Sequence, residues 1–442
     1  MHHHEPDFWS NLRSELAPGT QWIDRAVVLA YAAATGLVVV AFTFLSEAAS
    51  AGFEQLRQWG ELGPWLPLLW TPVLTVALLW WTRRFVPGAQ GSGIPQVVLA
   101  LGDDTSDAQR RGLVSLRLSL HKIGLVAGGL LAGLSIGREG PTVQVGAGVM
   151  QHATRWLSPR AGIDAHDLMV AGAAAGIAAA FNTPLGGVIF ALEQLSRRRS
   201  MSHSSLVIVC IVLSGLVAVS IFGNLSYFGE LPVQQLQWSL LGPGLLVALA
   251  AGLAGGLFSR LLVASARGLP DRFSRWRAAY PLRFAAGCAL AVACIGIVSG
   301  GTTAGAGYAP TRALLEAQGD VPTLYSLLKF CATWLSAWSG VPAGVFAPSL
   351  AIGAGIGHDV ARFMGVGAEA AIPLIALGMV GFLAATTQGP ITAFIIVMEM
   401  VSGHTMVLSL MACALLSSGV ARLLTRPMYA ELAAVTANGQ PR

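Results

Sequence analysis

The sequence predicts an all-α polytopic membrane protein, and two observations lead to that fold class. First, 54% of the 442 residues are hydrophobic and only 11% are charged, whereas a soluble domain carries about 25% charged residues. Second, the charged residues cluster and leave long apolar runs, and a transmembrane helix needs about 20 apolar residues. A soluble protein with buried helices would need far more polar surface to cover this much apolar sequence.

Several apolar runs are long enough to form helices that cross most of a bilayer. Examples are Ala26–Phe44, Trp65–Trp81, Leu206–Phe222, Leu241–Phe258, Phe284–Val298 and Thr405–Leu424. The first run is too long and too poorly flanked for a cleaved signal peptide, so we expect it to stay in the membrane. Arginine clusters at residues 83–84, 110–111, 197–199 and 267–283 separate such runs and indicate cytoplasmic loops.

Glycine and proline interrupt other segments and predict broken helices. The interruptions are Gly91–Pro95, Gly137–Pro141, Asn182–Pro184, Gly340–Pro348 and Gln388–Pro390. Broken helices at membrane depth are tolerated only where the freed backbone groups line a cavity or are buried in protein. Five such breaks in one chain therefore indicate an internal polar pathway.

The chain also repeats itself. Residues 137–149 (GREGPTVQVGAGV) match residues 344–356 (GVFAPSLAIGAGI) at an offset of 207 positions (344 − 137). Residues 184–193 match residues 390–399 at an offset of 206 (390 − 184), and each block runs from a proline to a glutamate. Paired interrupted helices in two halves point to a transport site at the bilayer midplane. Sequence identity alone does not show whether the halves are inverted.

This repeat sets the expected organisation of the chain. We expect one membrane domain at residues 26–430, with a first half at about 26–223 and a second at about 240–430. A cytoplasmic segment, residues 1–25, precedes the domain, and a short tail, residues 431–442, follows it. The histidines at positions 2–4 belong either to a tag or to a native start, so they indicate nothing about function.

Three of the interruptions are suited to binding an anion. In Gly137–Pro141, proline fits the first turn of a helix, and the glycines let the backbone turn tightly. The unpaired N–H groups of such a helix start carry the positive end of the helix dipole and attract anions without a metal. Gly344–Pro348 offers the same device, and Gly91–Pro95 adds the hydroxyl of Ser92.

Glu139 is the most informative residue of this set. It lies in an otherwise apolar stretch, where a carboxylate is costly without a partner. Its side chain can occupy the anion site as a tethered anion, and protonation would remove the charge and free the site. The alternative is a helix-capping glutamate paired with Arg138. However, the second repeat has Phe346 at the equivalent position, so helix capping does not require a glutamate here.

Other classes of function find little support. The five cysteines lie in apolar segments without a CxxC pair, so we expect inert thiols and no metal site. A membrane enzyme would need a nucleophile–base pair or a metal cluster, and the sequence contains neither HExxH nor GxSxG. His121, beside Lys122, is the only histidine of interest for such a role. No basic face interleaved with aromatic residues indicates a nucleic-acid partner.

Four motifs in the same order resemble the CLC family of chloride channels and proton-coupled chloride transporters, in its prokaryotic form without a C-terminal regulatory domain. They are GSGIP at 91–95, GREGPT at 137–142, GVFAP at 344–348 and the Tyr429 region, RPMY at 426–429. The match extends across essentially the whole chain. Lys122, 17 positions before Glu139, and residues 171–182 also resemble the family pattern.

The resemblance implies a homodimer with one pore per subunit, built from an inverted repeat of tilted helices. It also implies a bacterial inner-membrane location, chloride and protons as substrates, bound chloride ions and no cofactor. The central anion would be held by the hydroxyl groups of Ser92 and Tyr429 and by the backbone N–H groups of Gly344, Val345 and Phe346. Arg138 and Gly140 would help form an outer anion site. Glu139 would be the gating glutamate that exchanges with chloride and carries a proton.

One departure from the family pattern concerns proton transfer. The transporter branch commonly has two glutamates where this chain has Glu193 and Gln194, and glutamine does not titrate. Gln96 likewise replaces a frequently acidic residue, which leaves Lys122 without its usual carboxylate partner. Two functions therefore stay open. The first is chloride/proton antiport, with a water chain from near Glu193 to Glu139. The second is uncoupled chloride conduction by a channel or leaky transporter.

Overall fold

The fold is helical throughout the described part of the chain, which confirms the predicted class. The computed structural model describes residues 19–159, 163–195, 204–223, 227–229, 238–318 and 321–438. Apart from one isolated β-bridge, these residues form helices and the turns that join them. The arginine cluster at 197–199 lies outside the described residues.

The first half contains nine α-helices within the described residues. They are α2 (Gly19–Arg57), α3 (Pro67–Phe85), α4 (Ile94–Ala100), α5 (Asp107–Leu113), α6 (Leu116–Leu131), α7 (Glu139–His152), α8 (Ala165–Phe181), α9 (Pro184–Phe190) and α10 (Ser204–Phe222). A π-helical turn, Ala191–Leu195, extends α9. The five predicted interruptions in the chain all fall at helix boundaries, because glycine and proline end or begin a helix at each of them.

The second half repeats the order of the first. Its helices are α11 (Leu241–Arg267), α12 (Arg272–Ala279), α13 (Pro281–Val298), α14 (Tyr308–Leu315), α15 (Tyr325–Trp338), α16 (Phe346–Phe363), α17 (Ala368–Thr387), α18 (Pro390–Met400), α19 (Val407–Arg422) and α20 (Met428–Asn438). Equivalent helices end in the same way. Asn182 after α8 and Gln388 after α17 both adopt left-handed backbone angles, with φ of 56° and 52°.

Eight helical segments in the described part of the chain are long and apolar enough to cross a membrane. All six predicted apolar runs lie on such segments, which confirms them. Sequence reasoning missed the remaining two, Asp107–Leu131 and Ala368–Thr387. In the second of these, 94% of the most apolar 18-residue stretch is buried inside the protein. This helix therefore belongs to the centre of the fold rather than to its lipid-facing surface.

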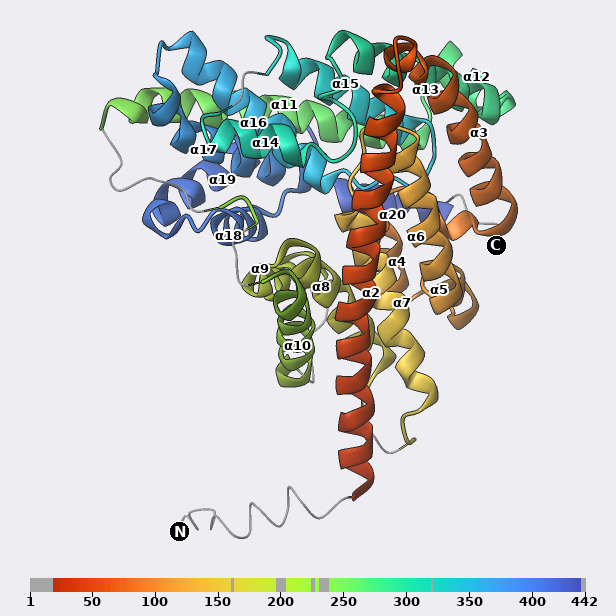
Figure 1. The fold of residues 1–442 in the computed structure, drawn as a ribbon. Coiled ribbons are helices and arrows are strands. Elements are labelled where there is room, and N and C mark those ends of the chain that lie inside the picture. The colour runs from red at the N-terminus through yellow and green to blue at the C-terminus, as the bar shows by residue number, and fades with distance from the viewer. Residues whose placement is uncertain are drawn as a thin grey trace.

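The two halves are inverted relative to each other. Gly137 and its repeat equivalent Gly344 form the isolated bridge, and the bridge is antiparallel. Equivalent residues that face each other in antiparallel directions are related by a local two-fold axis, which is the inversion that sequence identity left open. In Figure 1 the second-half helices fill the upper part of the view, α7 to α10 lie below them, and α2 spans the height.

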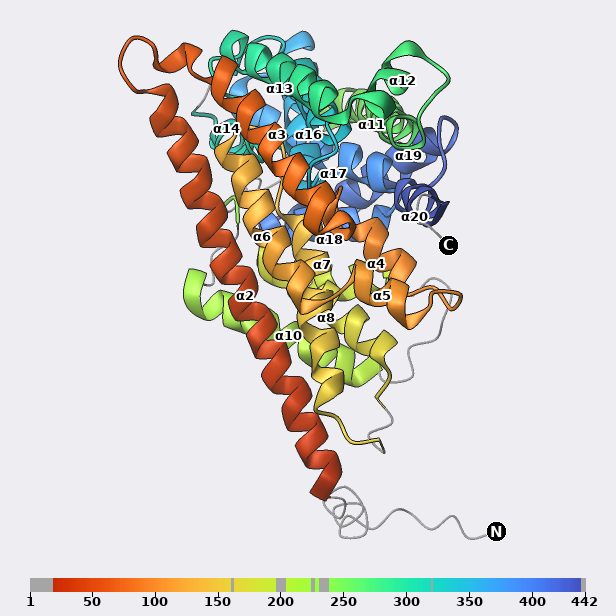
Figure 2. The ribbon, with the colours of Figure 1, turned by 90° about the vertical axis from the view of Figure 1, so that its right-hand side faces the viewer.

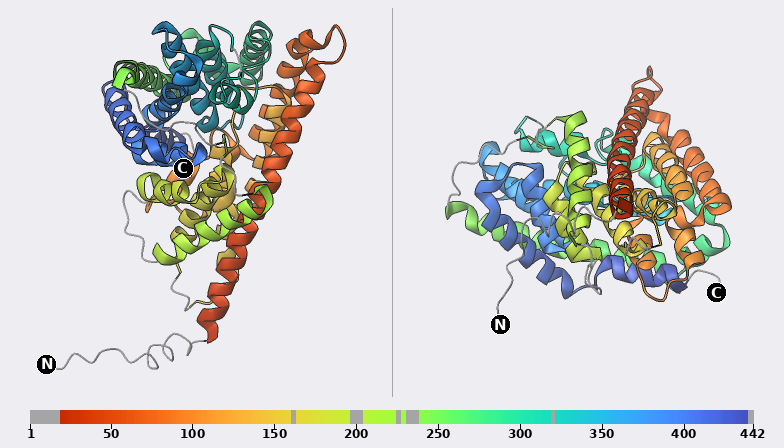
Figure 3. Two further views of the ribbon diagram at one scale, coloured as in Figure 1. Left: turned by 60° about the vertical axis from the view of Figure 1, so that its left-hand side comes forward. Right: turned by 90° about the horizontal axis from the view of Figure 1, so that it is seen from below.

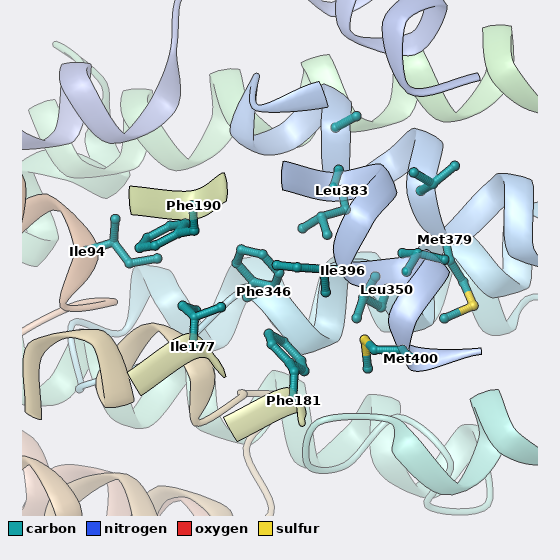
Figure 4. Packing of buried hydrophobic residues seen from close by; sticks show 14 of the residues in the cluster. Ile94, Ile177, Phe181, Phe190, Phe346, Leu350, Met379, Leu383, Ile396 and Met400 are labelled. Atoms are coloured by element: carbon teal, nitrogen blue, oxygen red, sulfur yellow. The ribbon is translucent and has the colours of Figure 1, made fainter. Parts of the chain in front are cut away.

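Both halves contribute to the packed centre. Figure 2 shows α2 tilted along one side of the molecule, with α6 and α7 beside it, and the left view of Figure 3 shows the same tilt. α20 packs against α4 of the first half and α11 of the second. In Figure 4, Phe346 lies among Phe190, Phe181 and Ile396, and all four are buried in one cluster. The helix starts that carry the predicted site are therefore anchored in protein, away from lipid.

Candidate functional site

The three glycine-marked helix starts converge. Gly137 N–H donates to the Gly344 carbonyl at 2.7 Å, and Gly344 N–H donates back at 3.1 Å, which joins the starts of α7 and α16. Ala343 N–H donates to the Gly91 carbonyl at 3.2 Å, which adds the loop before α4. Glycine is needed here, because a Cβ on Gly344 would meet the Gly137 carbonyl and lie 2.9 Å from Pro141 Cδ.

Glu139 begins α7 and is fully buried at this junction. Its Oε1 accepts a hydrogen bond from the hydroxyl of Tyr308, and it lies 3.9 Å from Arg138 Nε. Its Oε2 has no hydrogen-bond partner within the described residues. Oε2 lies next to Gly137, just before α7, because a Cβ on that glycine would meet it. The start of a helix favours negative charge nearby.

Arg138 is buried beside Glu139 and connects it to an aromatic group of residues. Its guanidinium donates to Tyr227 Oη at 3.1 Å and lies 3.4 Å from Glu47 Oε1. It also lies over the Tyr308 ring, 5.5 Å from the ring centroid, and the Tyr227 and Tyr308 centroids are 5.0 Å apart. We call Arg138, Tyr227 and Tyr308 the Arg–Tyr cluster. It covers one side of the Glu139 carboxyl group.

Sequence reasoning missed Tyr308, although a signal was present. Residues 305–310 (GAGYAP) resemble residues 91–95 (GSGIP), so that Tyr308 corresponds to Ile94. The structure supports this match, because Gly305 and Gly307 have φ of 62° and 88°, close to 72° and 102° at Gly91 and Gly93. The offset here is 214 (308 − 94) rather than 207, so a constant-offset comparison does not find it.

Ser92 lies on the other side of the α7 start. A Cβ on Gly140 would come within 2.7 Å of Ser92 Oγ, which shows how closely the serine approaches this helix. Ser92 and Val345 both line a cavity of about 650 Å³, to which α20 contributes Met428 and Leu432. The hydroxyl of Tyr429, also on α20, is buried. Neither the Ser92 nor the Tyr429 hydroxyl has a hydrogen-bond partner among the residues described.

Lys122 supports the loop before α4. Its Nζ is buried and donates to the carbonyls of Ala89 and Gly91 at 2.6 and 2.7 Å. In the described part of the chain, no ion pair joins it to a carboxylate. Gln96 accepts from Gly93 N–H at 3.0 Å through its side-chain oxygen. Backbone carbonyls thus bind Lys122 where the family pattern suggested a carboxylate.

Glu193 and Gln194 lie far along the chain from this junction and have different surroundings. Glu193 accepts from the N–H groups of Ile391 and Thr392 at 3.2 and 2.7 Å, so it caps the start of α18. It also lines a pocket that contains Arg422. Gln194 is buried, and its Nε2 has no hydrogen-bond partner within the residues that the structure describes.

Comparisons with known proteins identify the family. Residues 73–422 match the family described as voltage gated chloride channel. The H(+)/Cl(-) exchange transporter ClcA of Cronobacter sakazakii is 31% identical over 394 residues, covering 84% of this chain and 81% of that protein. ClcA of Citrobacter koseri is 28% identical over 428 residues, covering 91% and 86%.

Solved structures agree with this assignment. A slow cyanobacterial Cl−/H+ antiporter matches with a TM-score of 0.77 and 25% identity, covering 95% of this chain and 99% of that one. A eukaryotic CLC transporter matches with a TM-score of 0.73 at 21% identity, which shows the shared fold alone; it covers 94% of this chain and 74% of that one. With its helical inverted repeat, this integral membrane protein belongs to the voltage-gated chloride channel (CLC) family.

Proposed function

We propose that this protein exchanges chloride for protons across the membrane and that Glu139 is its gate. The observation that carries the proposal is a fully buried carboxyl group at the junction of two helix starts from opposite halves. A carboxylate and a chloride ion compete for the same N–H groups, and protonation of the carboxylate removes one competitor. The exchange activity in the names of its relatives supports the same reading.

The central chloride ion would lie between Ser92, Tyr429 and the start of α16. Both hydroxyl groups are buried donors without a partner in the described residues, so a bound anion would satisfy them. The N–H groups of Val345 and Phe346 begin α16, where no preceding turn accepts them. Gly344 N–H already donates to Gly137, so we assign it a role in bringing the helices together rather than in binding the ion.

An outer chloride ion would lie near the start of α7, where Glu139 competes with it. Arg138 and the N–H of Gly140 would contribute there. The buried guanidinium supplies positive charge close to the carboxyl group, 3.9 Å from Oε1. No cofactor is needed for this chemistry, because the ions are both substrates and ligands.

Uncoupled conduction is the second candidate, and Gln194 favours it. Glutamine offers no proton site, so protons would have to reach Glu139 by water from near Glu193. Lys122 would lie on this route, because it binds the carbonyl of Gly91, which lines the cavity of about 650 Å³. We propose that Glu193 takes up protons, because it lines an open pocket that Gln194 does not. A Gln194→Glu variant tests whether the missing carboxylate at position 194 limits proton coupling. If coupling is limited by the missing carboxylate, that variant moves more protons per chloride than the wild type.

We further propose that the protein works as a homodimer in a bacterial inner membrane, with one pathway in each subunit. Complete helix starts from both halves meet inside a single chain, so the anion site does not need the partner. Cross-linking in liposomes at low protein density measures the assembly, and only monomers under those conditions would contradict the dimer.

The deciding experiment measures both ions together in proteoliposomes. A chloride gradient should drive protons uphill in the wild type, and Glu139→Gln should abolish proton movement while chloride still flows. Glu369→Gln is the matched control, because that carboxylate is exposed at the start of α17. Chloride flux without proton flux in the wild type would establish uncoupled conduction instead.

A further inference from the structure

Tyr308 joins the two halves of the protein at the Glu139 carboxyl group. It is the first residue of α14 in the second half, and its hydroxyl donates to Oε1 of Glu139, 169 positions earlier in the chain. The equivalent residue in the first half is Ile94, which has no hydroxyl. A tyrosine is therefore not required to begin this kind of helix, and its hydroxyl needs another explanation.

The surroundings hold the Tyr308 hydroxyl in place. Lys329 Nζ donates to the carbonyls of Thr303 and Gly305 at 2.9 and 2.7 Å, which fixes the loop before α14. The ring packs against Tyr227, with centroids 5.0 Å apart, and against the Arg138 guanidinium. A donor held on several sides loses little entropy when it binds the carboxylate.

We propose that Tyr308 is a positioning residue whose hydrogen bond holds the charged Glu139 carboxylate at the anion site and slows its displacement by chloride. We call this hydrogen bond the latch. This inference rests on the proposed gating role of Glu139. A hydrogen bond to a carboxylate is stronger than one to a neutral carboxyl group, so the bond favours the charged carboxylate at the anion site. Chloride can replace Glu139 only after this bond breaks, and protonation weakens it.

Other groups also act on the Glu139 carboxyl group and would shape its response to pH. Arg138 lies beside it, and Tyr227 contacts Arg138 from the segment after α10. Glu47 of α2 reaches it indirectly, through Arg138. All three side chains are still present when only the Tyr308 hydroxyl is removed, although Tyr227 then loses its own hydrogen bond with Tyr308.

The test is Tyr308→Phe, which keeps the ring and removes only the hydroxyl. Chloride efflux from proteoliposomes above neutral pH should rise by about tenfold, the effect of one hydrogen bond to a charged group. This gain should become smaller as the pH falls, because protonation of the carboxyl group weakens the same bond. The pH of half-maximal efflux should therefore move upward in this variant.

A double-mutant cycle separates the latch from general loosening of the structure. In a Glu139→Ala background, Tyr308→Phe should have no further effect on efflux. Tyr325→Phe is the matched control, because Tyr325 is buried near the same loop and its hydroxyl has no partner in the described residues. Its pH profile should equal that of the wild type.

Each other outcome has a defined meaning. The latch is wrong if Tyr308→Phe leaves the pH profile unchanged, lowers efflux, or acts equally in the Glu139→Ala background. Efflux from Glu139→Ala that still depends on pH as in the wild type would instead contradict the proposed gate. If Tyr308→Phe does not fold, Tyr308→Ile, which copies Ile94, removes the hydroxyl together with the ring. Efflux that does not rise in that variant, or that rises equally in the Glu139→Ala background, contradicts the latch.

Discussion

The two halves of the protein share the buried contacts that support their loops but differ in the side chains at the proposed anion site. Lys122 and Lys329, 207 positions apart, are the two lysines of the chain, and each donates to two carbonyls of a glycine-rich loop. Glu193 caps α18 in the second half, and Glu399 caps α9 in the first by accepting from Leu185 and Gly186.

The differences lie at the junction itself. Glu139 corresponds to Phe346, Ser92 to Ala306, and Tyr308 to Ile94. In each pair only one copy carries a polar side chain. The inverted repeat therefore supplies the backbone geometry of these helix starts twice, whereas each polar side chain occurs in only one of the two copies. The proposed pathway, with Glu139 as its gate and Ser92 in its hydroxyl site, is asymmetric for that reason.

The largest expected effect comes from the close helix crossings that both halves contain. A Cβ on Gly146 would meet the Gly172 carbonyl, and a Cβ on Gly353 would meet the Gly378 carbonyl. Since backbone cannot move aside easily, we expect Gly146→Ala and Gly353→Ala each to destabilise the fold by about 3 kcal/mol. Thermal unfolding in detergent measures this.

Alanine at helical glycines with open space provides the control for these variants. Gly124→Ala and Gly296→Ala should leave stability unchanged or raise it slightly, because nothing lies within 4 Å of either Cβ position. If all four variants unfold at the same temperature, the crossings are looser than the structure indicates.

The buried lysines should give the next largest effect. Lys122→Met or Lys329→Met leaves two carbonyls without a donor, and we expect each to lower stability by about 2 kcal/mol. Arg260→Met, on an exposed part of α11, serves as the control. Unequal effects of the two lysine variants on the unfolding temperature would show that the two lysines do not support their loops equally.

The two capping glutamates allow the shared capping role to be separated from the proposed proton uptake by Glu193. Glu193→Gln and Glu399→Gln should each cost about 1 kcal/mol, because each weakens hydrogen bonds at a helix start. Proton flux should fall only in Glu193→Gln if that residue takes up protons. Equal proton flux in both variants would leave Glu193 with the capping role alone.

The smallest effect concerns the serine that the second half lacks. Ser92→Ala removes one hydroxyl donor and should weaken chloride binding by about fivefold, measured by calorimetry on the purified protein. Ala306→Ser adds a hydroxyl at the equivalent position and should leave chloride binding unchanged. Equal changes in both would mean that the two loops contribute alike to the anion site.

The helical membrane fold, the interrupted segments and the repeat could all be predicted from the amino-acid sequence. These features are local, because apolar runs, glycine and proline act on the few residues around them. The same local logic located Glu139 and Ser92, since each belongs to a glycine-marked helix start. The motif comparison added Tyr429, which no local pattern singles out.

The antiparallel contact between the halves and the partners of Glu139 became visible in the folded protein. The family resemblance implied the inversion, but no residue pattern showed it. The first half contains an additional helix, α5, between the segments equivalent to α14 and α15, so the spacing that hides Tyr308 depends on an inserted element. The bond from Tyr308 to Glu139 joins residues 169 positions apart. Such a contact depends on how whole helices pack, which no pattern of neighbouring residues records.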